Sequence, residues 1–294
     1  MQAQDLALIV AQLPAIARHT GGIIMAVRAS GDLGIVEKVS YGRNSPVTRA
    51  DKEANAYLTE ALKHITPGID VLSEEGDMQH NHTIARTHKR FWLVDPLDGT
   101  HNFIKGLDYF AVNIAFIEEG KPIAGAVYFP AQQTLYYTGG DGKAYRARDG
   151  EKPVPIQAKR AQSGRIPLIA LGYRDNQEHI RQMGVAPLVA AQEPLHAANA
   201  QRICMAAEGS CHLAIGSNYT STWDTAAPDA VLRAAGGVLI NAHTKLPMSY
   251  GADAQVMQDG KLFECANPPY LAGREETIAM IPGVTLPPAK RRLG

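Results

Sequence analysis

The sequence predicts an α+β region followed by an α/β region in a chain of 294 residues. Apolar residues at helical spacing occur near the N-terminus and again around residues 48–64. Strand-like runs joined by short turns dominate residues 91–147, and after about residue 155 strand-like and helix-like runs alternate. We therefore expect two halves, residues 1–155 and 156–294.

Helical spacing marks two segments of the first half. Residues 5–28 show it, with Pro14 at a position that starts or kinks a helix. A second helix is expected from Thr48 to about His64, because Thr48 is a good N-cap residue and Asp51 follows three positions later. The segment between these two helices is interpreted as a polar stretch.

Strand signals follow a polar, histidine-bearing loop expected at residues 78–90. The run FWLVD at 91–95 predicts a buried strand, and Pro96 is expected to end it because proline cannot donate a ladder hydrogen bond. Two hairpins are expected within residues 109–130 and 134–147. Neighbouring strands with such short turns indicate an antiparallel or mixed sheet.

The second half alternates strands with helices, which favours an α/β arrangement. Gly209 and the Gly236-Gly237 pair are expected to end two of its helices. The expected elements are strands at 166–171, 211–216 and 238–240, and helices at 177–183, 198–208 and 225–235.

Composition limits the classes of function. Lys+Arg and Asp+Glu both number 29, so no overall electrostatic attraction to nucleic acid or anionic lipid is expected. The three cysteines, Cys204, Cys211 and Cys265, form no CxxC pair and indicate neither a zinc site nor a disulfide framework. The N-terminus has no basic segment before its apolar residues, so we expect no signal peptide, no membrane span and a cytoplasmic location.

Acidic residues gather where elements are expected to end. Several have an ordinary structural explanation when taken alone. Asp51 can complete a capping box with Thr48, the Glu74-Glu75 pair can form an exposed turn, and Asp224 can favour a helix dipole. The group as a whole still calls for a functional interpretation.

The DPLDGT segment at residues 95–100 places two carboxylates at one strand end. Like charges this close repel, and a bound cation would compensate them. Mg²⁺ prefers such oxygen ligands, and two such ions would clamp both oxygens of a phosphoryl transfer. Phosphatases with an aspartyl nucleophile use Asp-x-Asp-x-Thr, but Pro96 occupies the nucleophile position here. Glycosidases use two separated carboxylates, which fits this turn poorly.

Three motifs together resemble the inositol monophosphatase-like, lithium-sensitive, Mg²⁺-dependent phosphatases: SEE at 73–75, WLVDPLDGT at 92–100 and WDTAAPDAVLRAAGG at 223–237. They occur in the family's order, and the similarity spans roughly residues 5–270. The resemblance implies a layered α-β-α-β-α sandwich. It also implies metal-assisted hydrolysis of a phosphate monoester without a covalent enzyme intermediate.

The resemblance assigns roles to residues of this chain. It implies that Asp51, Glu74 and Thr100 orient and activate the attacking water. It implies two or three Mg²⁺ ions held by Glu74, Asp95, Asp98, Asp224 and the backbone carbonyl of Leu97. It implies substrate contacts from Gly99, Thr100, Arg202 and Asp224.

Two substrate classes remain open. NSPVTRAD at 44–51 and ECANPPYL at 264–271 resemble the 3'(2'),5'-bisphosphate nucleotidases, which remove the 3'-phosphate of adenosine 3',5'-bisphosphate or its sulfated form. DGTHNF at 98–103 is closer to the inositol phosphatase pattern, and LGYRDN at 171–176 lacks the serines usual in the nucleotidases. The nucleotidase is the favoured hypothesis. The alternatives are a monophosphatase of inositol 1-phosphate or another sugar or polyol, an enzyme for another small phosphate ester, and a non-catalytic binder.

The expected partner is a small-molecule phosphate ester, with no nucleic-acid polymer and no membrane. The resemblance also suggests a homodimer. The spacing of His80, His82 and His88 is not that of a helical histidine pair, so they are expected to lie in a solvated surface loop.

Overall fold

The computed structural model describes residues 3–40, 43–162, 164–172, 177–188, 195–258 and 261–282. The elements of the first half are α1 (Ala3–Val10), α2 (Leu13–Ser30), β1 (Val36–Ser40), β2 (Arg43–Val47), α3 (Arg49–Ile65), β3 (Val71–Ser73), α4 (Met78–Thr87), β4 (Arg90–Asp98), α5 (Thr100–Ile104), β5 (Ala111–Glu118), β6 (Lys121–Phe129), η1 (Pro130–Gln132), β7 (Thr134–Thr138), β8 (Ala144–Arg148) and β9 (Val154–Ile156). Those of the second half are β10 (Ile169–Leu171), α6 (Gln177–Gln182), η2 (Ala186–Leu188), β11 (Leu195–His196), α7 (Asn199–Glu208), β12 (Leu213–Gly216), β13 (Thr220–Ser221), η3 (Thr222–Asp224), α8 (Ala226–Ala234), β14 (Val238–Asn241), β15 (Gln255–Gln258), β16 (Lys261–Glu264), β17 (Ala266–Asn267), β18 (Tyr270–Gly273) and α9 (Glu275–Ile278).

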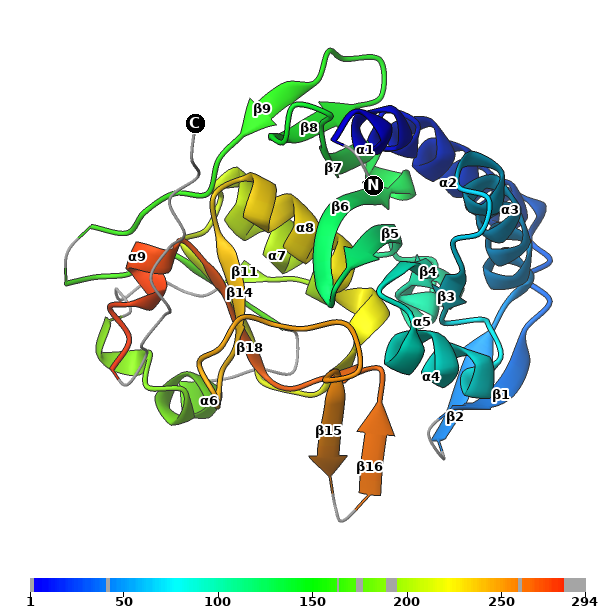
Figure 1. The fold of residues 1–294 in the computed structure, drawn as a ribbon. Coiled ribbons are helices and arrows are strands. Elements are labelled where there is room, and N and C mark those ends of the chain that lie inside the picture. The colour runs from blue at the N-terminus through cyan, green and yellow to red at the C-terminus, as the bar shows by residue number, and fades with distance from the viewer. Residues whose placement is uncertain are drawn as a thin grey trace.

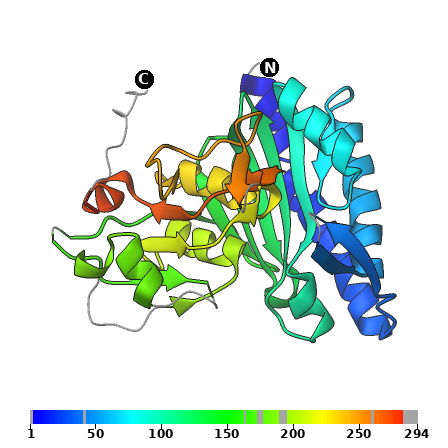
Figure 2. The ribbon, with the colours of Figure 1, turned by 90° about the horizontal axis from the view of Figure 1, so that it is seen from below.

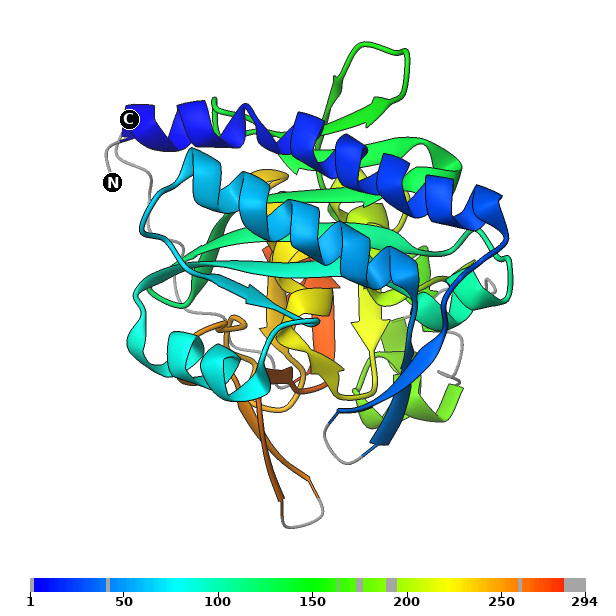
Figure 3. The ribbon, with the colours of Figure 1, turned by 90° about the vertical axis from the view of Figure 1, so that its right-hand side faces the viewer.

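The elements stack in five layers in the order α-β-α-β-α, which confirms the predicted sandwich (Figure 1 and Figure 2). On one outer side, α2 and α3 cover a seven-stranded sheet with the order β3-β4-β5-β6-β7-β8-β9 (Figure 3). On the other side of that sheet lie α7 and α8, followed by a five-stranded sheet with the order β11-β10-β12-β18-β14. Ile278 of α9 packs in a hydrophobic cluster with Leu271 of the five-stranded sheet, and α9 belongs to the last layer.

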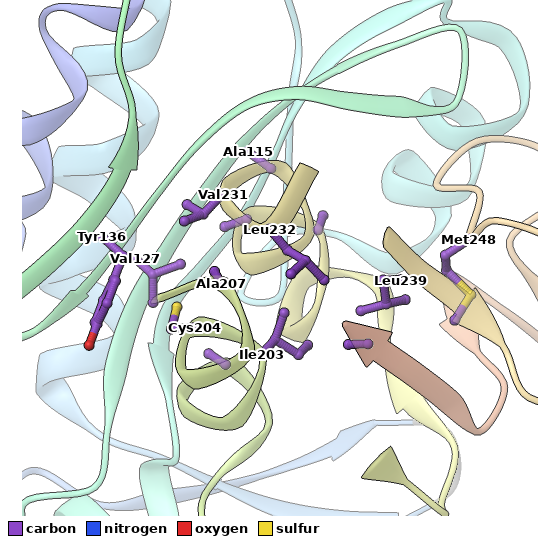
Figure 4. Close-up of a cluster of buried hydrophobic side chains, with 14 of the residues drawn as sticks. Ala115, Val127, Tyr136, Ile203, Cys204, Ala207, Val231, Leu232, Leu239 and Met248 are labelled. Atoms are coloured by element: carbon purple, nitrogen blue, oxygen red, sulfur yellow. The ribbon is translucent and has the colours of Figure 1, made fainter. Parts of the chain in front are cut away.

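The middle layer joins the two sheets through a shared core (Figure 4). Val127 and Tyr136 of the seven-stranded sheet belong to the same buried cluster as Ile203 of α7. The cluster continues through Leu232 of α8 to Leu239 of the five-stranded sheet. Burial of this apolar surface is the main stabilising contribution to the contact between the sheets.

Two glycines set how closely helices approach β6. A Cβ at Gly125 would lie 2.6 Å from the carbonyl oxygen of Ala227 and 2.9 Å from the Cβ of Ala230, both on α8. A Cβ at Gly21 of α2 would lie 2.4 Å from a ring carbon of Tyr128. Both glycines therefore permit contacts that a side chain would prevent.

Residues 78–87 form α4, so the expectation of a loop there is wrong. Asp77 caps this helix by accepting a hydrogen bond from a backbone N–H three residues later, at 2.8 Å. Asn81, Ile84 and Ala85 are buried, whereas most of the other positions are polar. The narrow buried face explains why the apolar pattern of this helix was missed.

The N-terminal segment contains two helices, and Pro14 lies in the first turn of the second, as predicted. By length and composition, the helical run Asp5–Ser30 could span a membrane, with a mean hydropathy of 1.3. In this structure Leu13, Ile24 and other apolar residues of α2 are instead buried against the seven-stranded sheet. The segment that was interpreted as a polar stretch contains the β1–β2 hairpin.

Candidate active site

Parallel pairing of β3 with β4 brings Glu74 beside Asp95. Ser73 pairs with Val94 in this register, and the backbone N–H of Glu74 donates to the carbonyl of Val94 at 3.2 Å. Glu74 and Asp95 each follow these paired residues, so their carboxyl groups emerge at the same end of adjacent strands. The two carboxyl groups are close enough for each to affect the pKa of the other.

A β-bulge in β4 arranges the rest of the DPLDGT segment. Asp95 pairs with Asn113 and Asp98 with Ala111, so β4 carries one more residue than β5 between these pairs. Pro96 lies inside this bulge, where no ladder donor is needed, and the expectation that it ends the strand is wrong. The backbone N–H of Leu97 donates to Asp95 Oδ1 at 3.0 Å and holds that carboxylate in place.

Asp224 reaches the same place from the second half of the chain. It ends η3, and the backbone N–H of Thr222 in that turn donates to the carbonyl of Cys265 at 2.9 Å. One carboxylate oxygen from each of Asp95, Asp98 and Asp224 lies within 4.8 Å of the others. No other such acidic, histidine or cysteine group occurs within the described part of the chain.

The carboxyl groups of this site have raised pKa values. Burial raises the pKa of Glu74 to about 7, although Lys38 opposes the change. Burial likewise raises the pKa of Asp98 to about 6, against the lowering effects of Asn113 and Arg202. For Asp95 and Asp224, burial and then repulsion from the neighbouring carboxylates raise the pKa well above 3.8.

This donor set fits a hard divalent cation. All of the donor atoms are carboxylate oxygens. Burial and repulsion between these carboxylates raise the pKa values of Asp95 and Asp224. A cation such as Mg²⁺ would favour the ionised forms and is normally bound by oxygen ligands of this kind. The chemistry of the residues therefore agrees with the predicted metal site.

Asp51 lies at the junction of α3 and the acidic group. The predicted capping box is confirmed, because Thr48 donates to Asp51 Oδ2 from its backbone N–H at 2.7 Å and from its hydroxyl at 2.6 Å. Asp51 Oδ1 accepts from the Thr100 hydroxyl at 3.0 Å. The cap and the contact with the site therefore use the same buried carboxylate.

Gly99 forms the turn that leads from β4 into α5. Its φ of 93° is in the left-handed region, and a Cβ there would lie 2.8 Å from the carbonyl oxygen of Tyr109. The carbonyl of Gly99 accepts from the backbone N–H groups of Asn102 and Phe103 at 2.8 and 3.0 Å. The short helix α5 thus begins at Thr100, the last residue of the DPLDGT segment.

Arg202 anchors the first turn of α7 near the acidic group. It is 5% exposed, and Nε donates to the hydroxyl of Tyr270 at 2.8 Å while Nη1 donates to the carbonyl of Ala197 at 3.3 Å. The Arg202 charge also lowers the pKa of Asp98, as does a hydrogen bond from the backbone of Ala200. Arg202 is thus close enough to Asp98 to affect the ionisation of that carboxyl group.

Lys38 of β1 is a site residue that the sequence analysis missed. Its Nζ lies 2.5 Å from Glu75 Oε1 and 3.6 Å from Glu74 Oε1. Burial lowers its pKa, but the attraction to Glu74 and Glu75 is greater in sum and leaves that pKa raised. Because β1 was interpreted as part of a polar stretch, no pattern in the sequence linked Lys38 to these acids.

Two histidines of the segment at residues 78–90 contact acidic residues outside the candidate active site. His82 Nδ1 lies 2.9 Å from Glu264 Oε2, and His88 Nε2 lies 2.9 Å from Asp70 Oδ2. The His82 side chain is partly buried, so the expectation of a solvated side chain is wrong for His82, whereas the His88 side chain is 37% exposed.

Comparison with known proteins agrees with this geometry. The family model described as "Inositol monophosphatase family" matches residues 5–273. The protein named 3'(2'),5'-bisphosphate nucleotidase CysQ from Salmonella typhimurium is 38% identical over 76% of this chain and 87% of the relative. The protein of the same name from Escherichia coli K12 is 37% identical over the same shares of the two chains.

Solved structures show the same fold. CysQ from Bacteroides thetaiotaomicron, described as a bacterial member of the inositol monophosphatase family, has a TM-score of 0.67 and 26% identity, covering 92% of this chain and 97% of that one. An IMPase from Thermotoga maritima has a TM-score of 0.64 and 21% identity, covering 90% and 91% of the two chains. Fold and site together define a phosphatase built around an acidic centre that β4 and the turn before α8 form. The chain belongs to the inositol monophosphatase family.

Proposed function

We propose that this phosphatase is a metal-dependent 3'(2'),5'-bisphosphate nucleotidase, which removes the 3'-phosphate of adenosine 3',5'-bisphosphate or its sulfated form. Its relatives of that name are 37% and 38% identical over 76% of this chain. The cluster of three carboxylates from Asp95, Asp98 and Asp224 is the observation that carries the proposal. One oxygen from each lies within 4.8 Å of the oxygens from the other two. Small phosphate esters are the substrates of the family.

The proposed cofactor is Mg²⁺, as two or three ions. The residues that would hold it are Glu74, Asp95, Asp98, Asp224 and the Leu97 carbonyl. When bound, the cation supplies positive charge for the phosphoryl oxygens and makes water more acidic. The raised carboxyl pKa values described above support this assignment, since a cation would relieve the repulsion that raises them.

Asp51 and Thr100 are proposed to orient the attacking water, together with Glu74. The Thr100 hydroxyl donates to Asp51 Oδ1 at 3.0 Å, so its oxygen lone pairs are free to accept a hydrogen bond from water. Thr48 holds the other oxygen of Asp51 through two hydrogen bonds of 2.7 and 2.6 Å. This arrangement keeps the water-orienting pair rigid.

The substrate phosphate is proposed to bind at the turn of Gly99 and Thr100, where the backbone N–H groups can donate to it. Arg202 is proposed to add positive charge on the other side of Asp98, and Asp224 to contact the leaving group. The segment LGYRDN, where the sequence departs from the nucleotidase pattern, lies largely outside the described residues. The DGTHNF motif keeps an inositol or other polyol phosphate as the second candidate substrate class.

The test is phosphate release from a panel of esters with Mg²⁺, with adenosine 3',5'-bisphosphate and inositol 1-phosphate compared at equal concentration. We expect the higher kcat/KM for the bisphosphate and inhibition by lithium. A preference for inositol 1-phosphate would replace the proposal by the second candidate. Absence of turnover for every ester would leave a non-catalytic binder. An Asp95→Asn protein purified in parallel controls for contaminating phosphatases.

A further inference from the structure

Asn113 is a polar side chain on an otherwise apolar face of β5. Ala111 and Ala115, two positions away on either side, belong to the core cluster that β5 shares with α7 and α8 (Figure 4). Val112 and Ile114, which alternate with them, pack on the opposite face in the cluster of α2 and α3. Asn113 is 0% exposed. Its amide therefore points from the sheet toward the middle layer, between two alanines.

The register of β4 and β5 places this amide beside the aspartates of the DPLDGT segment. Asn113 pairs with Asp95, and Ala111 pairs with Asp98. Residues directly opposite each other in an antiparallel pair have Cβ atoms about 4.5–5.5 Å apart, with both side chains on one face. The β-bulge thus leaves both aspartates on the face of Asn113, and one carboxylate oxygen from each lies within 4.8 Å of the other. The Asn113 amide lies next to carboxylates that are proposed to hold the cation.

Neither polar atom of the Asn113 amide has a partner with ordinary hydrogen-bond geometry among the described residues. An amide buried in this way costs free energy, and native proteins satisfy most such groups. An apolar residue like the alanines on either side would serve the packing of this face without that cost. The amide therefore indicates a function at the acidic centre.

The neighbouring carboxylates need hydrogen-bond donors, which the amide can supply. An ionised carboxylate only accepts, and its two oxygens can take several bonds besides a cation. The Leu97 N–H already donates to Asp95 Oδ1 at 3.0 Å. Asn113 also lowers the pKa of Asp98, as expected of a donor near a carboxylate. Unlike the ammonium group of Lys38, the amide adds no positive charge that would repel a cation.

We propose that Asn113 is a positioning residue of the cation site. With a cation bound, its two N–H donors hold the carboxylates of Asp95 and Asp98 and leave their other oxygens to the cation. Groups that orient metal ligands in this way change metal affinity although they do not touch the metal. This inference rests on the proposed metal-dependent function.

Asn113→Leu tests the role, because leucine has nearly the shape of asparagine and no polar side-chain atom. Mg²⁺ binding, measured by calorimetry without substrate, should weaken about 10- to 100-fold. The Mg²⁺ concentration for half-maximal phosphate release should rise by the same factor, with KM for the ester at saturating Mg²⁺ within about twofold of wild type. In EDTA the unfolding temperature should equal or exceed that of wild type, since the variant removes a buried amide without an ordinary partner.

Thr277→Val is the matched control, because it also replaces a buried polar side chain by an apolar one of similar shape. Thr277 is 0% exposed on α9, and its hydroxyl accepts from the backbone N–H of Ala161 at 2.9 Å. Loss of this satisfied group should lower the unfolding temperature and leave Mg²⁺ affinity unchanged. The two variants should therefore differ in both measurements.

The outcomes separate this inference from the function on which it rests. Wild-type protein that neither binds nor needs Mg²⁺ would overturn the proposed metal-dependent function. If the wild type binds Mg²⁺ and folded Asn113→Leu binds it within about twofold as tightly, the positioning role alone is wrong. It is also wrong if Thr277→Val loses Mg²⁺ affinity to the same degree. Should Asn113→Leu fail to fold, Asn113→Ala takes its place with the same criterion.

Discussion

Replacing Asp95 by asparagine should have opposite effects on stability and activity. Asp95 is 1% exposed and shares its surroundings with the carboxyl groups of Glu74, Asp98 and Asp224. Asparagine keeps the oxygen that accepts from the Leu97 N–H at 3.0 Å, and it removes one buried acid. Without metal the variant should therefore be more stable than the wild type, while its Mg²⁺-dependent activity is largely lost.

The size of the stability gain follows from the electrostatics of the group. A carboxyl pKa raised from 4.5 to about 7, as for Glu74, corresponds to about 3 kcal/mol. Protonated Glu74 contributes this free energy to the stability of the folded state. The contribution is fully present below the unfolded-state pKa near 4.5 and is lost as pH rises through the folded-state pKa of about 7. Removing one neighbouring charge should recover about 1–3 kcal/mol above pH 7, or about 2–10 °C in unfolding temperature.

Thermal unfolding in EDTA at about pH 8 and about pH 4.5 measures this gain. The advantage of Asp95→Asn should be largest at the higher pH and small at the lower one. Asp141→Asn, at a turn where the acid is 44% exposed, is the control and should change little. With Mg²⁺, phosphate release by Asp95→Asn should fall about 10²- to 10⁴-fold. A lower unfolding temperature in EDTA at pH 8, or full activity with Mg²⁺, would refute the reasoning.

Two further predictions test the charge and packing of the chain. Mg²⁺ affinity, measured by calorimetry, should increase as pH rises through about 6 and about 7, because Asp98 and Glu74 must lose their protons to bind a cation; an affinity independent of pH would contradict this. Gly21→Ala should lower the free energy of unfolding by about 1–3 kcal/mol, since its Cβ would lie 2.4 Å from Tyr128. Gly22→Ala, with nothing within 4 Å, should raise it by up to about 1 kcal/mol, and the reverse order in thermal unfolding would argue against the packing.

Elements with a strong local signal could be predicted from the sequence. The cap at Thr48 starts α3, and Gly209 in the left-handed conformation ends α7, because both residues satisfy backbone groups at a helix end. The layered fold was predicted from the motif resemblance, since no local pattern specifies how two sheets stack. The division into halves at residues 155 and 156 stays a prediction.

The remaining differences come from tertiary contacts. Pro96 lies within a strand because the bulge between Asp95 and Asp98 leaves this position without a ladder hydrogen bond, so the absent N–H of proline costs nothing there. The expectation that proline ends a strand considers one strand alone and does not include its pairing with a neighbour. The β15–β16 hairpin projects from the body and was missed altogether (Figure 1). Lys38 meets Glu74 only through folding of a hairpin that is distant in sequence. The acidic residues were identified as a group because the order of their motifs can be read from the sequence, whereas a contact such as that of Lys38 with Glu74 cannot.

The contact at Gly125 has a consequence for recombining this chain with its relatives. Asp224 lies two residues before the start of α8, and α8 rests on β6 where Ala227 and Ala230 meet Gly125. A chimera that takes its first half from one protein and its second half from another inherits the two sides of this contact separately. An incoming α8 with a larger residue at either alanine would be displaced from the sheet, and Asp224 would move away from Asp95 and Asp98 although every acidic residue was retained. Crossovers that keep β6 and α8 from the same parent should therefore preserve activity better than those that separate them.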